Sequence, residues 1–241
     1  MILDGKMKIC CISDTHGCLP EIKEEVDLLI HAGDICPNKY GPKERLLDAY
    51  IQVDWIDDFY ISWLKTLKAK KIVQIWGNHD FIEEVIHDKI KWPKNVIHLN
   101  DNKKYYKKKK IIIDDREIVV WGCPWSAHFF NWAFNAPKGD YAEEFLGNIY
   151  KSITDEVDII VSHSPPKGYG DKCPDGYLAG SNKLLKKFKE IDNCKLLVTG
   201  HVHGGQGVYD LYEGLENKRI VNASVLNEDY RLVNKPIFID F

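Results

Sequence analysis

Apolar runs and short polar clusters alternate along this chain. Five continuous apolar stretches are typical of strands covered on both faces, and they are Lys8–Ile12, Leu28–Ile30, Ile72–Trp76, Asp158–Val161 and Leu196–Val198. The polar clusters that follow them are Asp14-Thr15-His16, Gly33-Asp34, Gly77-Asn78-His79-Asp80, His163 and Gly200-His201-Val202-His203. Ligands gather at the carboxyl ends of strands in open α/β sheets, so these clusters are expected to meet at one site.

Helical and further strand patterns complete the predicted fold. Apolar positions recur at helical spacing over Ala49–Lys68 and Asn182–Lys189. Short β-rich runs occupy the middle of the chain at Val96–Leu99, Ile111–Ile113 and Ile118–Trp121, the last two joined as a hairpin. A final trio, Val208–Leu211, Arg219–Asn222 and Pro236–Asp240, predicts a second sheet that closes the fold. The pattern therefore predicts an α/β protein, a four-layer αββα sandwich of two mixed β-sheets flanked by helices.

Composition agrees with a single enzyme-sized domain. The chain has 241 residues, 44% of them hydrophobic, and a formal net charge of −3, and one domain over residues 1–241 is expected. No apolar run is long enough to cross a bilayer, and the first six residues lack a secretory signal, so a cytoplasmic location without a membrane partner is expected. Seven cysteines show no spacing typical of a disulfide framework or a cysteine-ligated zinc.

The polar clusters together form a candidate metal site. Aspartate, asparagine and histidine suit borderline divalent ions such as manganese, iron, zinc, nickel or cobalt. Seven candidate ligands are too many for one tetrahedral ion and suit two ions that share a carboxylate; they are Asp14, His16, Asp34, Asn78, His163, His201 and His203. Two metals ~3.5–4 Å apart can clamp a displacement at phosphorus. The residues therefore predict hydrolysis of a phosphate ester at the strand ends.

Each cluster also has a simpler interpretation. An aspartate after a strand is most often a helix N-cap, and a glycine there usually makes a turn. Single short motifs carry a high false-positive risk. The metal-site interpretation rests on the complete set, in which each cluster follows a predicted strand.

The ordered motifs D-x-H, G-D, G-N-H-D, a lone His and G-H-x-H resemble the calcineurin-like metallophosphoesterase superfamily. The segments His163–Gly168, Gly122–Ser126 and Val221–Ser224 are similar to its branch of metallophosphoesterase domain-containing proteins. The resemblance implies an αββα fold and a phosphodiesterase that acts on small diesters, including cyclic nucleotides, through a hydroxide shared by two metals. Some members of the branch have glycine at the first histidine of the last motif. His201 stands at that position here, which implies an active enzyme.

The same resemblance implies a role for each cluster residue. One metal would be held by Asp14, His16, Asp34 and His203, and the other by Asp34, Asn78, His163 and His201, with Asp34 bridging and Mn²⁺ favoured. Asn78 and His79 would contact the substrate, and His79 would bind the phosphoryl group or protonate the leaving oxygen. Asp80 has two open interpretations: it orients the imidazole of His79, or it fastens its loop through backbone amides.

Three other segments bear on substrate choice. Trp125 and Phe129 belong to an aromatic stretch that either covers the sheet or stacks on a nucleotide base. The run Lys103–Lys110 either binds a nucleic-acid backbone or keeps a hairpin edge solvated, and the slightly acidic chain disfavours nucleic acid. Residues 164–171, rich in proline and glycine, predict a loop beside the site, where loops often set substrate choice.

Three functions remain open from the sequence. A metal-dependent phosphodiesterase acting on a small, nucleotide-like diester is favoured. A nuclease or phosphomonoesterase could use the same two metals. A nucleotide-binding module with little turnover is the third alternative, and the complete ligand set argues against it.

Overall fold

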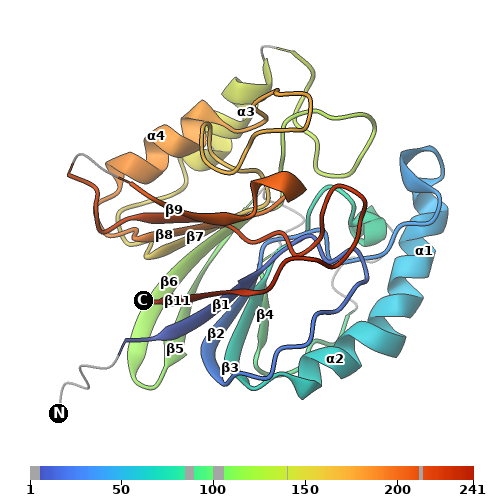
Figure 1. Ribbon diagram of the computed structural model, residues 1–241, viewed down its shortest axis with the longest axis horizontal. Coiled ribbons are helices and arrows are strands. Elements are labelled where there is room, and N and C mark those ends of the chain that lie inside the picture. Colours follow the sequence, from blue (N-terminus) through green and yellow to red (C-terminus); the bar gives the residue numbers. More distant parts are fainter. Residues whose placement is uncertain (1–5, 85–89, 100–105, 140, 212–213) are drawn as a thin grey trace.

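Two β-sheets lie face to face, with helices against both outer faces (Figure 1). The computed structural model describes residues 6–84, 90–99, 106–139, 141–211 and 214–241. The first sheet contains, in spatial order, β11 (Ile237–Asp240), β1 (Lys8–Ile12), β2 (Val26–His31), β3 (Ala69–Gln74) and β4 (Val96–His98). The second contains β5 (Lys107–Ile113), β6 (Arg116–Cys123), β7 (Ile159–Ser162), β8 (Leu196–Thr199), β10 (Arg219–Asn222) and β9 (Gly207–Asp210).

Both sheets mix parallel and antiparallel pairs. In the first sheet only β11 is antiparallel, and β1 to β4 run parallel. In the second sheet β6, β7, β8 and β10 are parallel, and β5 and β9 add antiparallel edges. The parallel centres bring the carboxyl ends of β1, β2, β3, β7 and β8 to one side of the sandwich, as Figure 1 shows. The predicted αββα sandwich of mixed sheets is confirmed.

Three apolar layers explain why the central strands are continuously apolar. Between the sheets, Ile30 and Val73 pack against Val161 and Val198. The outer faces of the two sheets are covered by helices, which bury side chains such as Tyr60 and Leu64 on the first sheet and Leu184 and Phe188 on the second. Strands buried on both faces need apolar residues at consecutive positions, which is the pattern seen in the sequence.

The predicted helices are present, and one helix was not predicted. The segment Ala49–Lys68 corresponds to α1 (Arg45–Trp55), a π-helical turn (Ile56–Tyr60) and α2 (Ile61–Thr66). The helix α4 (Asn182–Glu190) begins at Ser181, whose Oγ accepts from Leu184 N at 3.1 Å. The unpredicted helix is α3 (Tyr141–Tyr150), which buries few of its side chains. Short 3₁₀ turns occur at Gly41–Lys43, Phe81–Glu84 and His203–Gly205. Among the described residues, no helix combines the length and apolarity needed to cross a membrane.

The last strand joins the first sheet, so the predicted placement of Pro236–Asp240 in the second sheet is wrong. Strand β11 pairs antiparallel with β1, with Ile9 opposite Ile239. The pairing covers the edge of β1 that β2 leaves open. Local sequence predicts a strand but does not specify its partner, which depends on the path of the whole chain.

The lysine run lies on the outer strand of the second sheet. Lys107–Lys110 form the first half of β5, which pairs with β6 on one side only. Lys110 forms an ion pair of 2.6 Å with Glu117. A lysine-rich edge strand resists pairing with other chains, so the position of these four residues agrees with the solvated-edge interpretation. Residues 103–105 of the run lie outside the described part.

Candidate metal centre

All seven predicted ligands lie close together where the strands end. Asp14 and His16 follow β1, Asp34 follows β2, and the remaining ligands follow β3, β7 and β8: Asn78, His163, His201 and His203. Three groups of side chains, each with ligand atoms within 4.8 Å of one another, are Asp14, His16 and His203; His16, Asp34 and His79; and Asp14, Asp34 and His163. The convergence predicted from the strand ends is present.

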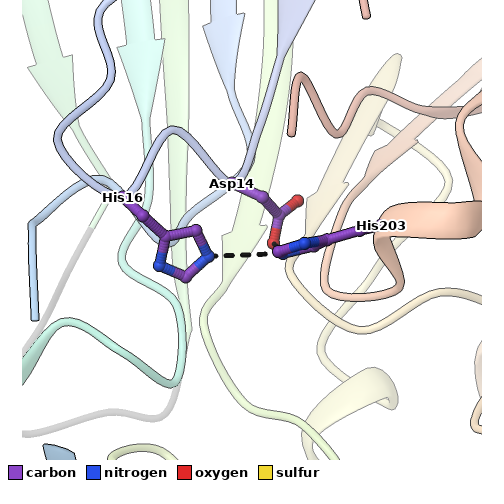
Figure 2. Close-up of side chains that lie close together, drawn as sticks. All are labelled: Asp14, His16 and His203. Carbon is purple, nitrogen blue, oxygen red and sulfur yellow. Dashed lines mark hydrogen bonds and ion pairs between the residues drawn. The ribbon is translucent and has the colours of Figure 1, made fainter. Parts of the chain in front are cut away.

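The first part of the cluster joins β1 to β8. His16 Nε2 lies 3.3 Å from His203 Nε2, and His203 Nε2 lies 3.7 Å from Asp14 Oδ1 (Figure 2). His16 Nε2 is also 3.6 Å from Asp34 Oδ2. Two imidazole nitrogens and two carboxylates thus face a common centre.

The second part joins β3, β7 and β8 through Asn78. The Oδ1 atom of Asn78 lies 2.9 Å from His163 Nε2 and 2.7 Å from His201 Nδ1. His163 Nε2 is 3.3 Å from Asp34 Oδ2, the same oxygen that contacts His16. Asp34 therefore contacts both parts of the cluster.

The ligand loops hold a strained backbone. Four ligands have φ angles in the left-handed region, which costs a non-glycine residue roughly 1–3 kcal/mol: Asp14 at 54°, His16 at 42°, Asp34 at 52° and His201 at 69°. Two motif glycines make room for the carboxylates. A Cβ on Gly77 would collide with Asp34 Oδ1, and a Cβ on Gly200 would collide with Asp14 Oδ2. Strain of this kind gathers at functional sites.

Backbone carbonyls and a serine orient the ligands. His163 Nδ1 donates to Ala32 O, and His203 Nδ1 donates to Asn227 O, each at 2.9 Å. A carbonyl oxygen only accepts, so both Nδ1 atoms carry the proton and both Nε2 lone pairs are available to a metal. Asp14 Oδ2 accepts from Ser224 Oγ at 2.6 Å. Ser224 and Asn227 were not predicted as site residues. Ser224 belongs to the segment Val221–Ser224 that supports the family resemblance, which was the one sequence signal for it, whereas Asn227 has none.

The charges within the cluster suit a cation. Burial opposes ionisation of Asp34, but the neighbouring His163 and His79 hold its pKa well below the usual range. Burial lowers the pKa of His16, and it lowers that of His201 to about 4. Burial acts in the same direction on His163, but Asp34 outweighs it and raises the pKa of His163 to about 9. An ionised Asp34 and neutral imidazoles at His16 and His201 are donor forms that bind divalent metals. His163 would release its Nε2 proton to a bound ion, so the residues fit two such ions.

His79 lies against this cluster and is held on several sides. Its ring stacks on Trp132 with centroids 3.8 Å apart and meets the ring of His16 edge to face at 4.6 Å. Its Nδ1 donates to Asn38 Oδ1 at 2.7 Å, and its backbone N donates to Asp34 Oδ1 at 2.7 Å. Burial lowers the pKa of His79 to about 3. The position beside the metal ligands suits a residue that acts on the substrate.

Asp80 fastens its loop. Its carboxylate accepts backbone N–H groups from Ile35 at 3.2 Å, Cys36 at 2.8 Å and Gly77 at 2.7 Å. The side chain that orients the imidazole of His79 is Asn38. Of the two interpretations of Asp80, these contacts support loop fastening, and a catalytic role for Asp80 stays a prediction.

Two aromatic rings that were not predicted border the site. Trp125 packs against Phe145 and Phe134, with ring centroids 5.0 and 6.0 Å away, and Phe129 is 54% exposed with its ring against Phe130. A pocket of about 320 Å³ opens beside the cluster and is lined by His16, Cys18, Asn38, His79, Trp132, Leu226 and Tyr230. Trp132 and Tyr230 thus border the pocket, and substrate contact by Trp125 and Phe129 stays a prediction. Aromatic content identified the stretch, but its turns decide which ring reaches the site.

Tyr230 is a further site residue without a sequence signal. Its ring centroid lies 4.9 Å from that of His16 and 5.2 Å from that of His203. The residue has a φ of 58°, and its loop is held by Tyr230 N donating to Asn227 O at 2.9 Å. The ring is half exposed and covers the histidines from the solvent side.

Comparison with known proteins identifies a family, relatives and similar folds. A family model described as calcineurin-like phosphoesterase matches residues 7–205. Human metallophosphoesterase domain-containing protein 1 is 31% identical over 98% of this chain and 71% of its own length, and a UPF0046 protein of Caenorhabditis elegans is 24% identical over 99% and 82%. In fold, the chain is similar to a dimetal phosphatase from Danio rerio, with a TM-score of 0.52, 11% identity, and coverage of 91% of this chain and 87% of that one. A protein from Thermus thermophilus gives a TM-score of 0.50 at 13% identity, covering 98% and 99% of the two chains. The chain belongs to the calcineurin-like phosphoesterase family, the metal-dependent phosphoesterases whose ligand motifs it carries.

Proposed function

We propose that the protein is a phosphodiesterase that hydrolyses a small phosphodiester with two divalent metal ions. The observation that carries this proposal is the complete set of seven ligands, in which Asp34 contacts both parts of the cluster. Asp14, His16, Asp34 and His203 would hold one ion, and Asp34, Asn78, His163 and His201 the other. When bound, such ions supply a water of lowered pKa and positive charge for the oxyanion that develops at phosphorus.

His79 is the proposed general acid. The ring borders the pocket and stands edge to face with the proposed ligand His16. Its Nδ1 is engaged by Asn38, so Nε2 is the nitrogen available to a substrate. A proton delivered from Nε2 to the leaving oxygen would neutralise the alkoxide as the P–O bond breaks.

A nucleotide is the proposed class of diester. The pocket of about 320 Å³ beside His79 is large enough for a small organic group and has aromatic walls. Trp132 is already stacked on His79 and on Phe81, at 3.8 and 5.5 Å. Tyr230, half exposed at the rim, offers ring surface on which a base could stack. Manganese as the bound ion and a cytoplasmic location remain predictions from the sequence.

The test is hydrolysis of bis-p-nitrophenyl phosphate beside p-nitrophenyl phosphate, with chelator-stripped protein and with added Mn²⁺. Faster metal-dependent turnover of the diester is expected. Preference for the monoester would replace the proposal with a phosphomonoesterase, and two bound metals without turnover of either ester would favour a binding module. Asp34→Asn is the matched control, because removal of the shared carboxylate should abolish metal-dependent turnover. Retention of labelled oligonucleotide at low salt would point to the nuclease alternative instead.

A further inference from the structure

Asn38 lies outside the predicted metal motifs and contacts His79 at two points. Its Oδ1 lies 2.7 Å from His79 Nδ1, and its Nδ2 donates to His79 O at 3.0 Å. One amide side chain therefore binds both the ring and the main chain of the same residue. Asn38 also lines the pocket beside the metal cluster.

These two contacts determine which ring nitrogen of His79 carries the proton. The carbonyl oxygen of His79 only accepts, so the NH₂ group of Asn38 must face it. The amide oxygen of Asn38 then faces the ring, and because that oxygen also only accepts, Nδ1 must be the donor. A neutral imidazole has one N–H, so Nε2 has a free lone pair.

The plane of the ring is set by stacking. Trp132 lies at an interplanar angle of 25° to His79, and Phe81 is nearly parallel to Trp132 at 8°. The stack restricts tilting of the imidazole. A half-turn of the ring within the stack would replace Nδ1 by a carbon opposite Asn38 Oδ1 and lose the hydrogen bond. Asn38 and Trp132 together therefore define a single ring orientation.

The main chain of His79 has anchors apart from Asn38. Gln52 Nε2 donates to His79 O at 2.8 Å, and His79 N donates to Asp34 Oδ1 at 2.7 Å. Loss of the Asn38 side chain would leave both of these contacts in place. The contribution specific to Asn38 is its hydrogen bond to the ring.

We propose that Asn38 is a positioning residue that holds His79 in the Nδ1-protonated tautomer, so that Nε2 exchanges protons with the substrate. The inference rests on the proposed role of His79 in the reaction. In the step concerned, the neutral ring first takes up a proton at Nε2 from solvent. This proton passes to the leaving oxygen as the attacking oxygen bonds to phosphorus and the P–O bond to the leaving group breaks. The ring then returns to the neutral form, with the proton still on Nδ1 and donated to Asn38 Oδ1.

Nuclear magnetic resonance tests the tautomer without turnover. Long-range ¹⁵N–¹H spectra of the Zn²⁺-loaded protein should show His79 as the Nδ1–H tautomer, and Asn38→Ala should shift the ring toward Nε2–H. Gln52→Ala, which removes a main-chain anchor of the same residue, should leave the tautomer unchanged. An Nε2–H tautomer in the wild type, or an unchanged tautomer in Asn38→Ala, would overturn the inference.

Kinetics test the consequence for the leaving group. A phenolate stabilised by a nitro group needs little protonation, whereas plain phenolate needs more, so p-nitrophenyl methyl phosphate is compared with phenyl methyl phosphate. Asn38→Ala should lose about tenfold more activity on the phenyl ester than on the nitrophenyl ester, since general acid catalysis contributes about 10²–10⁴-fold in total. Asn38→Asp, which keeps an acceptor for Nδ1–H, should remove most of this difference between the two esters. Gln52→Ala should lower both rates by the same factor.

The two proposals fail in distinguishable ways. Equal losses on both esters in Asn38→Ala, with two metals still bound, would overturn the role of Asn38 and leave the phosphodiesterase proposal intact. A wild-type protein that cleaves no diester would overturn the phosphodiesterase proposal, and the tautomer measured by magnetic resonance would then decide the role of Asn38.

Discussion

Ser224 Oγ donates a 2.6 Å hydrogen bond to Oδ2 of Asp14, across 210 positions of sequence. Next to this contact, Val225 N donates to Ser13 O at 3.0 Å. The segment after β10 thus lies against the end of β1 and holds the carboxylate of Asp14, a proposed metal ligand. Ser224 lies beyond residues 7–205, the part of the chain that matches the family model.

Ser224→Ala should weaken metal binding without unfolding the protein. Hydrogen bonds to a metal-binding carboxylate fix its orientation, and their loss costs about 10–100-fold in affinity. Competition with a chelator measures the effect. Ser126→Ala is the control, because Ser126 Oγ is also buried but has no hydrogen-bond partner among the described residues. Equal metal affinity in both variants would contradict a supporting role for Ser224.

His79→Ala should keep both metals and lose most of kcat. The side chain borders the cluster but is not needed as a ligand, and a positioned proton donor contributes about 10²–10⁴-fold. Metal content by elemental analysis and kcat on bis-p-nitrophenyl phosphate are measured together. Undiminished kcat would exclude the acid role, and loss of one metal would show that His79 is a ligand.

Tyr230→Ala should raise KM for a nucleotide diester more than for bis-p-nitrophenyl phosphate. The loss of one base-stacking ring costs about 1–3 kcal/mol, which is roughly 5–150-fold in binding. Tyr230→Phe, which keeps the ring, should behave like the wild type. An unchanged KM for every nucleotide tested in the alanine variant would remove the stacking proposal.

Lys218→Met should destabilise the second sheet and its helices. The buried ammonium donates to the carbonyl oxygens of Phe188 and Cys194 at 2.9 Å and to that of Ile191. Three acceptors, one in the last turn of α4 and two in the segment after it, would lose their donor, which should lower the free energy of unfolding by about 3 kcal/mol. Urea titration measures this change in the free energy of unfolding. The control Lys186→Met, on the exposed face of α4, should change stability by less than about 0.5 kcal/mol.

The buried His31 should make the metal-free protein less stable in acid. Burial lowers its pKa from 6.5 to about 3, against the opposing effect of Asp14 and Asp34. Below pH 6.5 the unfolded chain therefore binds a proton that the folded protein does not. The contribution of His31 is fully present above pH 6.5 and is lost as the pH falls toward 3.

His31→Gln tests this contribution. Thr15 Oγ1 donates to Ile35 O at 3.1 Å and accepts from His31 Nε2 at 3.1 Å, and a glutamine amide keeps a donor there. Urea titrations measure the free energy of unfolding at each pH. As the pH falls from 6.5 to 3, this free energy should decrease less steeply in His31→Gln than in the wild type, and the two slopes should differ by up to about 1.4 kcal/mol per pH unit. If the free energy of unfolding falls with pH at the same slope in the variant and the wild type, His31 does not contribute to the acid sensitivity.

The sequence by itself determined the layered fold and the seven proposed ligands. Each ligand follows an apolar strand within a few residues, as Asp14 follows β1 and His163 follows β7. Parallel strands align their carboxyl ends, so residues placed there must meet whatever the loops do. Local pattern and sheet geometry were therefore sufficient for this part of the site.

Only the tertiary structure decided the residues that support and border the cluster. Asn38, Trp132 and Tyr230 lie in loops, and Ser224 follows β10. Their positions depend on how loops pack across the two sheets. The local spacing of hydrophobic and polar residues carries no information about that packing. The same reason explains why β11 joins β1, since the partner of a strand is set by the path of the whole chain.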